Sequence, residues 1–490
     1  MLLLTIGLLH IPPVQNLAVD KITKYLTEST GYNTSIDYVN IRWFNSVVVD
    51  GAKIYDADSL KMISVDEMVI TFDLESLIRE KDIALKEAWI DGAEVNLRST
   101  DSSGLNVVKW AKKITQRSAE KDSLSEEPPF FAINKISLLN SEFSISNDAK
   151  DSIDDGFDFN HFRLKNINAD LMNLKAVMQD FQIDVRHLST YDEKTGLDIH
   201  ELSTYFNVSK DQMAFYDLNL NMGETHIKDS VVFRFEKPEH MAYFIDSVNI
   251  SANFSETILH SNELSQFAPE LKNFNDRIEL SGYFKGTVTS FYADNFNLKL
   301  GDHTNLEGSI EIDGLPKIND ALFSIDLYNS SIKATDFQKH LPERPFQISN
   351  KLGLIKLDGR FDGFIKDFVA NGNFETEIGN FNSNTNLEIT DNDIATYNGR
   401  LSMNNFDIGY FIEDSLYQNM NMIGSIQGSG FTLENADFLL EANISSVGIN
   451  GYEYNDIVTD GRFAQSFFSG DMTVDDSNFI LSASGSVDLR

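Results

Sequence analysis

The residues that most often carry chemistry are present, but none stands in a spacing typical of a catalytic or metal site. The nine histidines are scattered along the chain. His200-Glu201 and Glu239-His240 are isolated pairs, without the His-Glu-x-x-His spacing that places two zinc ligands on one helix face. Asp151, Asp154, Asp155 and Asp158 surround Gly156 but lack the alternating ligands and the closing glutamate of a calcium loop. We interpret this segment as a solvated acidic turn.

A glycine-rich run, GSIQGSG over residues 424–430, invites comparison with a phosphate-binding loop. We expect it between strands, where it opens no helix, and it contains no lysine, so phosphate binding is not predicted. Pairs of carboxylates do not indicate glycoside hydrolysis here, because 75 acidic residues produce such pairs by chance. We therefore predict no catalytic, cofactor-binding or metal-ligating residue, no cofactor, and a protein that is not an enzyme.

The clearest pattern is a strict alternation of apolar and polar residues. This period of two indicates strands with one apolar face and one face of amides, hydroxyls and acids. We expect the apolar residues to line the inside of a groove, namely Val248, Ile250, Ala252, Phe254, Phe323, Ile325, Leu327, Phe438, Leu440, Ala442, Ile444, Phe479, Leu481 and Ala483.

Composition excludes several classes of protein. The formal net charge of -35 disfavours binding to nucleic acid, whose phosphates need cations. It also disfavours binding to anionic lipid by electrostatic attraction alone. A simpler role for the acid excess is to keep a long surface soluble. The absence of cysteine excludes disulfides and thiolate metal sites. A hydrophobic content of 42% excludes bulk disorder.

The first thirteen residues form an apolar start that ends at Pro12-Pro13. It is shorter than the roughly 20 residues that a membrane span needs, so we expect about ten more apolar residues upstream in the natural gene. We interpret residues 1–13 as the end of a truncated transmembrane anchor; a buried helix or strand is the alternative. The apolar anchor residues are Leu2, Leu3, Leu4, Ile6, Leu8, Leu9 and Ile11.

Residues 14–114 read as a first module. An amphipathic helix over residues 14–26 stops at Gly31, and caps the sheet end or lies on the membrane. The strands and helices that follow are a hairpin over 36–44 and 47–54, a strand at 68–72, a helix at 74–80, a strand pair over 83–97 broken at Asp91-Gly92, and a helix carrying Val107, Trp110, Ala111 and Ile114. Residues 115–129 read as a linker or loop.

Residues 130–490 read as an elongated, mainly β region with helical interruptions at 262–271, 336–341 and 407–413. We expect on the order of 28 strands here, at roughly 13 residues per strand and turn. Periodicity alone leaves two arrangements open: one long antiparallel sheet curled into a trough, or two facing sheets of a sandwich. The strand number favours the trough, and we expect the sheet to continue beyond the C-terminus.

Several stretches in order resemble the N-terminal portion of TamB-like proteins of the AsmA superfamily, in the form typical of Bacteroidota envelopes. They are IPPVQ at 11–15, IDYVNI at 36–41, FNSVVVDG at 44–51, TFDLESLIR at 71–79, AWIDGAEVNL at 88–97 and SQFAPEL at 265–271. The resemblance extends loosely over the whole chain.

This resemblance implies a single-pass inner-membrane protein whose bulk lies in the periplasm of a Gram-negative envelope. It also implies a hydrophobic groove linked to phospholipid transport between membranes and to outer-membrane protein assembly and secretion. A BamA-family outer-membrane partner would bind through a C-terminal domain that is absent from this sequence. The anchor is also shorter than that of the family.

Three functions therefore compete at this stage. The first is a bridge whose apolar strand faces hold phospholipid or other acyl-chain cargo. The second is a cell-surface structural or adhesin array, with packed apolar faces and no lipid. The third is a carbohydrate-active enzyme on a β scaffold. The sequence decides neither the identity of the cargo nor the direction of its transport.

A single long sheet predicts an elongated particle. At about 4.8 Å between strands, on the order of 28 strands extend on the order of 100 Å or more. A compact globule of this length has a radius of gyration of only about 23 Å. Small-angle X-ray scattering of the full chain should give a rod-like profile, and a compact profile would contradict the trough.

Overall fold

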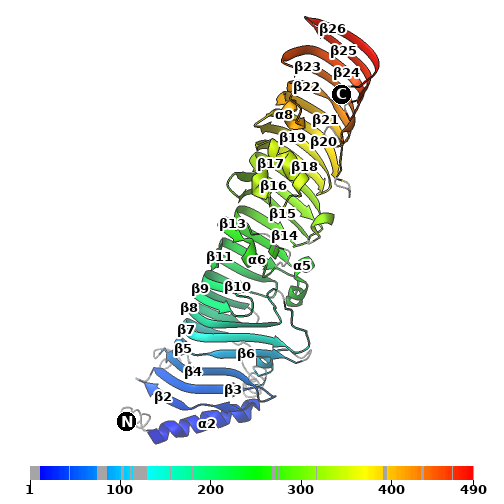
Figure 1. Cartoon of the computed structure of the whole chain (residues 1–490). Helices are drawn as coiled ribbons and strands as arrows, with labels where there is room; N and C mark the ends of the chain where they lie inside the picture. Colours follow the sequence, from blue (N-terminus) through cyan, green and yellow to red (C-terminus); the bar gives the residue numbers. More distant parts are fainter. Residues whose placement is uncertain are drawn as a thin grey trace. The chain divides into compact units, whose positions relative to one another are not determined.

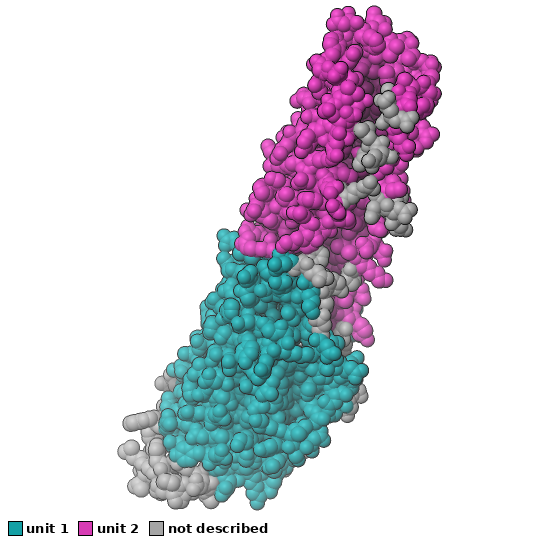
Figure 2. Space-filling view, viewed as in Figure 1, with its two compact units in different colours: residues 1–239, 256–275 teal, residues 240–255, 276–490 magenta. Residues whose placement is uncertain are grey.

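The computed structural model describes residues 12–42, 45–73, 85–100, 104–110, 113, 130–154, 156–177, 180–267, 271–272, 275–315, 317–389, 394–431, 435–465 and 467–488. The chain is mainly β, with 68% strand and 12% helix. It divides into two compact units (Figure 2). Unit 1 comprises residues 1–239 and 256–275, and unit 2 comprises residues 240–255 and 276–490.

Unit 1 contains one long helix and a run of strands in chain order (Figure 1). Its elements are α2 (Pro12–Thr30), β1 (Thr34–Ser35), β2 (Tyr38–Arg42), β3 (Ser46–Tyr55), β4 (Lys61–Phe72), β5 (Leu85–Asp91), β6 (Glu94–Ser99), β7 (Phe130–Asn147), β8 (His161–Val177), β9 (Asp180–Asp192), β10 (Asp198–Val208), β11 (Gln212–Met222), β12 (Thr225–Arg234) and α6 (Ser261–Leu264). Strand β13 (Asn249–His260) and the short helix η1 (Pro238–Tyr243) contribute residues to both units.

Unit 2 begins with α5 (Phe244–Ser247) and continues as a meander of strands with short helical turns. Its elements are β14 (Arg277–Gly286), β15 (Ser290–Leu300), β16 (Thr304–Asp313), η3 (Ile318–Asp320), β17 (Leu322–Lys333), η4 (Ala334–Phe337), α7 (Glu343–Lys351), β18 (Leu354–Phe364), β19 (Asp367–Thr376), β20 (Gly379–Ile389), β21 (Ala395–Asp407), α8 (Ile408–Ile412), β22 (Tyr417–Ser429), β23 (Asp437–Ile449), β24 (Tyr452–Ala464), β25 (Phe467–Asp476) and β26 (Phe479–Asp488). In Figure 1 the strands at the red end curve along their length.

Within each unit the described strands belong to one sheet, and almost every strand is antiparallel to the next in the chain. No second sheet faces it among the described residues. The sandwich arrangement that the sequence left open is therefore not what these strands form.

The predicted N-terminal amphipathic helix is confirmed as α2. It begins at Pro12, a favoured first position because proline's missing N–H costs nothing there. It ends before Gly31, whose φ of 72° is left-handed and whose N–H donates to the Thr27 carbonyl oxygen at 2.8 Å. The helix contacts β1 and β2, at the edge of the sheet in unit 1, so it covers backbone groups that an open edge would expose.

Several predicted elements of the first module need correction or fall outside the description. The predicted strand at 68–72 is only the end of β4. Strands β5 and β6 do end and begin around Asp91-Gly92, but they do not pair with each other; both lie between β4 and a parallel β7. Residues 106–110 are helical, as predicted. The predicted helix 74–80, the linker 115–129 and residues 1–11 of the predicted anchor 1–13 lie outside the described residues. Pro12 and Pro13, which we assigned to the anchor, are instead the first residues of α2.

The predicted helical interruptions near residues 262, 336 and 407 are confirmed as α6, η4 and α8, whereas η1, α5, η3 and α7 were not predicted. The predicted number of strands was too high. Between Phe130 and the C-terminus the structure describes twenty strands, β7 to β26, because each of them is ten residues long or more. No described helix is long and apolar enough to cross a membrane.

β-Bulges interrupt the ladders at residues whose backbone is left-handed. In unit 2 the register shifts by one residue at Asn295, Asn329 and Asn405, with φ of 48–50°. In unit 1 the same happens at Asn140 and Asp217, among others. Asparagine and aspartate tolerate this conformation better than other side chains. Each bulge bends its strand and increases the local twist.

Beside two left-handed residues, Asn329 and Glu256, a buried hydroxyl binds a backbone amide of the neighbouring strand. Next to Asn329, the Ser330 hydroxyl accepts a hydrogen bond from the Glu307 N–H at 2.9 Å, and Ser330 is only 2% exposed. In unit 1 the fully buried Thr257 hydroxyl accepts from the Lys228 N–H at 3.1 Å. These hydroxyls provide acceptors for partly buried backbone amides.

Replacing Ser330 with alanine should lower the free energy of unfolding by about 1–3 kcal/mol, because the partly buried Glu307 N–H loses its acceptor. Ser331→Ala is the matched control, since the exposed Ser331 hydroxyl only donates to the His303 carbonyl oxygen. Water can donate a hydrogen bond to that oxygen in its place. Urea unfolding followed by circular dichroism measures both. Equal midpoints for the two variants would contradict this role of Ser330.

Candidate functional site

The apolar face of unit 2 is the side of the sheet that carries Phe438, Leu440, Ala442 and Ile444; we call the opposite side the polar face. Residues directly opposite in an antiparallel ladder lie on the same face. Ladder partners link Ile325 to Leu440 through one residue of each intervening strand, Phe361, Ala370, Thr385, Gly399 and Ile426. Residues 115 positions apart in the sequence are thereby part of one apolar face.

All fourteen predicted groove residues lie on strands of this sheet or directly beside one. Phe254 of β13 contacts Phe284 of β14, with ring centroids 5.5 Å apart, and Phe284 pairs with Ala293 on the same face. Leu481 and Ala483 pair with Val474 and Met472. Their arrangement on one face agrees with the alternation in the sequence, while their role as the lining of a groove stays a prediction.

These residues differ in how deeply they are buried. The buried ones are Val248, Ala252, Leu327, Ala442 and Ile444; the half-buried ones are Ile250, Phe254, Phe323, Ile325, Phe438, Leu440 and Leu481; the exposed ones are Phe479 and Ala483 of the last strand. Two hydrophobic clusters run across neighbouring strands, one around Phe296, Leu327 and Phe374 and one around Met422, Ile444 and Val474. The apolar face therefore buries its residues largely against one another.

Glycines on the apolar face mark where neighbouring strands approach closely. A Cβ added at Gly372 would lie 2.6 Å from the Asp358 carbonyl oxygen and 2.7 Å from the Gly359 Cα. Gly424 and Gly428 are equally confined against β23. The glycine-rich run at 424–430, which we expected between strands, lies mostly inside β22. Its glycines serve strand packing on the apolar face.

The titratable groups near this face are held in structural roles. Tyr397 is buried on the apolar face, and its hydroxyl donates to the Gly430 carbonyl oxygen at 2.8 Å. Burial, with a smaller effect of Asp437, raises the pKa of Tyr397 to about 12. It therefore stays protonated at neutral pH and is a poor general base.

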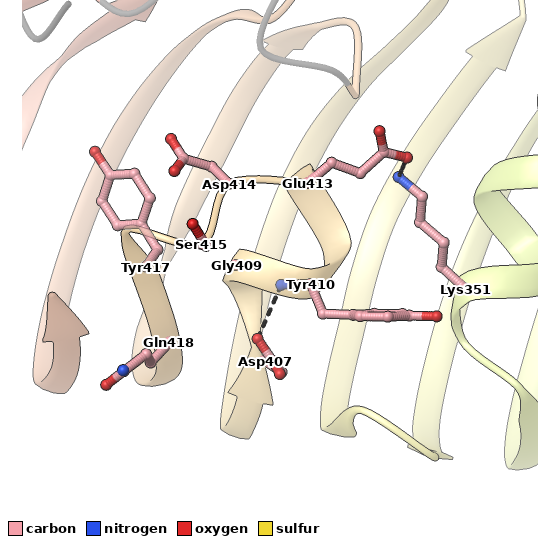
Figure 3. A pocket seen from close by; sticks show the side chains of 9 residues that line it. All are labelled: Lys351, Asp407, Gly409, Tyr410, Glu413, Asp414, Ser415, Tyr417 and Gln418. Atoms are coloured by element: carbon pink, nitrogen blue, oxygen red, sulfur yellow. Dashed lines mark hydrogen bonds and ion pairs between the residues drawn. The ribbon is translucent and has the colours of Figure 1, made fainter. Parts of the chain in front are cut away.

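A shallow pocket of about 540 Å³ lies beside α8 (Figure 3). The Lys351 ammonium binds Glu413 at 2.7 Å and the Phe411 carbonyl oxygen at 2.9 Å. Asp407 caps α8 by accepting from the Tyr410 N–H at 2.9 Å. Burial and Asp414 raise the pKa of Tyr417. Lys351 and Asp407, the groups best suited to bind or activate a substrate here, are thus engaged by the protein itself.

The acidic segment around Gly156 is only partly the solvated turn that we expected. Asp151 and Asp154 are exposed, but Asp158 is buried and accepts hydrogen bonds from the N–H groups of Ile153 and Asn160. Its pKa is lowered by these bonds and by His161, although burial opposes the shift. The carboxylate of Asp158 therefore organises the loop. Asp155 lies outside the described residues.

Several histidines pair with carboxylates that the sequence could not identify. His340 Nε2 lies 2.5 Å from Asp276 Oδ2, across 64 residues, and His161 Nδ1 lies 3.1 Å from Asp158 Oδ2. His200 of the isolated pair His200-Glu201 lies beside Asp198 instead. Within the described residues, no cluster of three or more histidines and carboxylates could hold a metal ion.

Comparisons with protein-family models, curated proteins and solved structures found no match. The resemblance to TamB-like proteins accordingly stays a prediction.

Gly372→Ala should lower the melting temperature, because its Cβ would overlap the backbone of β18; overpacking of this kind costs about 1–3 kcal/mol. The adjacent variant Asn371→Ala is the control, since Asn371 is exposed on the polar face. Differential scanning calorimetry compares the two. A melting temperature unchanged by Gly372→Ala would contradict this, because it would mean that β18 and β19 accommodate the added methyl group without loss of stability.

Proposed function

We propose that this protein is a non-enzymatic carrier that holds acyl chains of phospholipids against the apolar face of its sheet, in the envelope of a Gram-negative cell. Residues 1–11 would belong to an inner-membrane anchor, and the sheet would lie in the periplasm. In this role the protein contributes to outer-membrane biogenesis.

The observation that carries the proposal is the linked apolar face of unit 2. It extends through every strand from β14 to β26 by direct ladder pairing. Among the described residues no second sheet covers it. Acyl chains need a surface of this chemistry, because transfer of their methylene groups from water to an apolar surface is favourable.

The polar groups support binding of lipid over catalysis. Several described carboxylates beside the strands are engaged in capping and loop hydrogen bonds, as at Asp407 and Asp158. With a net charge of -35, attraction of anionic headgroups would not drive binding. Apolar contact with the acyl chains would provide most of the affinity.

Adjacent leucines provide a matched test. Leu440 is half-buried on the apolar face, whereas Leu439 is 53% exposed on the polar face. Leu440→Asp should reduce the phospholipid that co-purifies with the full chain severalfold, because a carboxylate beside acyl chains must be desolvated. Leu439→Asp should leave it unchanged. Lipid is measured by mass spectrometry after extraction in mild detergent.

Circular dichroism separates loss of lipid from loss of fold. A photo-cross-linking residue at position 440 should capture an acyl-chain probe, and the same residue at 439 should not. If the wild-type chain carries no phospholipid and neither position cross-links, the apolar face serves only packing. That result would favour the structural array without lipid cargo.

A further inference from the structure

The polar face of β19, β20 and β21 carries a regular grid of amides. Ladder pairing aligns three rows of three residues: Val369, Asn386 and Asn398; Asn371, Asn384 and Arg400; Asn373, Asn382 and Ser402. Six of the nine are asparagines. The ladders between β18 and β21 contain no bulge, so the spacing stays regular at about 4.8 Å across strands and roughly 6.7 Å along them.

The amides of this grid are exposed and available. All six asparagines and Arg400 are exposed. Within the described part of the chain, no hydrogen bond joins any of these six amide groups to another protein group. Each amide offers two N–H donors and one acceptor oxygen, so the grid presents donors and acceptors together on one surface.

This composition is unfavourable for the strands that carry it. Asparagine is depleted in strands because it does not pack well on a pleated surface. Farther along the polar face, β23 to β25 carry Glu441, Asp460, Arg462, Asp471 and Thr473 at equivalent positions. The polar face can therefore be solvated by residues other than asparagine. Residues that are unfavourable in strands are expected where a surface has a binding role.

Arg400 stands at the edge of the central row, between Asn384 of β20 and Ser425 of β22. It forms no ion pair with any described residue. By contrast, Arg360 pairs with Asp362 at 2.7 Å and Arg462 pairs with Asp437 on the same face. In a chain with 75 acidic residues, an unpaired guanidinium within a field of neutral amides is suited to one anionic group of a ligand.

The chemistry of the grid excludes most classes of partner. A protein interface needs an apolar centre, and only Val369 at a corner is apolar. Nucleic acid needs many cations, and the grid has one. We propose that this surface binds a glycan chain that carries a carboxylate substituent, with the asparagine amides bound to sugar hydroxyls and Arg400 bound to the carboxylate. This inference is independent of the lipid-carrying role of the opposite face.

The test uses the full chain and two probes with the same sugar backbone: N-acetylglucosamine oligomers, and the same oligomers with a few hydroxyls converted to carboxymethyl ethers. Biolayer interferometry should show tighter binding of the carboxymethylated probe. Arg400→Gln should weaken that binding by roughly tenfold or more, the size expected for a lost charge-assisted contact, and should leave the neutral probe unaffected. The double variant Asn382→Ala with Asn384→Ala should weaken both probes.

Matched controls lie on the same face outside the grid. Arg462→Gln removes an exposed but paired arginine, and Asn443→Ala removes an exposed amide of β23; neither should change binding. Melting temperatures confirm that every variant is folded. Absence of binding to both probes, or equal binding by the wild type, Arg400→Gln and the double asparagine variant, would overturn the proposal.

Discussion

The fold of unit 2 depends on how closely neighbouring strands approach on its apolar face. No second sheet covers that face among the described residues, so its side chains must bury against one another. Strands that curve toward one face crowd the Cβ atoms there, and glycine relieves the crowding. Gly359 and Gly372 face each other across β18 and β19, where any Cβ would meet the opposite backbone. Large side chains such as Leu357 and Phe374 pack beside them.

The bulges impose a second requirement, on hydrogen bonding. Each extra residue bends a strand, but it also removes a ladder partner from the neighbouring strand. Asparagine supplies the left-handed residue at Asn295, Asn329 and Asn405, and beside Asn329 the Ser330 hydroxyl accepts a hydrogen bond from the Glu307 N–H. At this bulge the residue that bends the strand and the residue that supplies the hydrogen-bond acceptor are neighbours in the sequence.

The two faces of the same strands then offer different chemistry. On β19 to β21 the apolar face carries Ala370, Phe381 and Leu401, whereas the polar face carries the asparagine grid around Arg400. Because successive side chains point to opposite faces, one short segment can present an apolar surface and an amide surface independently. A lipid-carrying face and a glycan-binding face are therefore compatible in one sheet.

The sequence alone determined the features that depend on neighbours in the chain. Alternation identified which residues of β23 share a face, and glycine placed the end of α2. The contacts between residues far apart in the sequence were decided by the register of the strands. The parallel pairing of β5 and β6 with β7, the contact of His340 with Asp276, and the grid of asparagines all depend on which residues of different strands lie opposite each other. Turn lengths and bulges set that register, and the period of two contains no information about either.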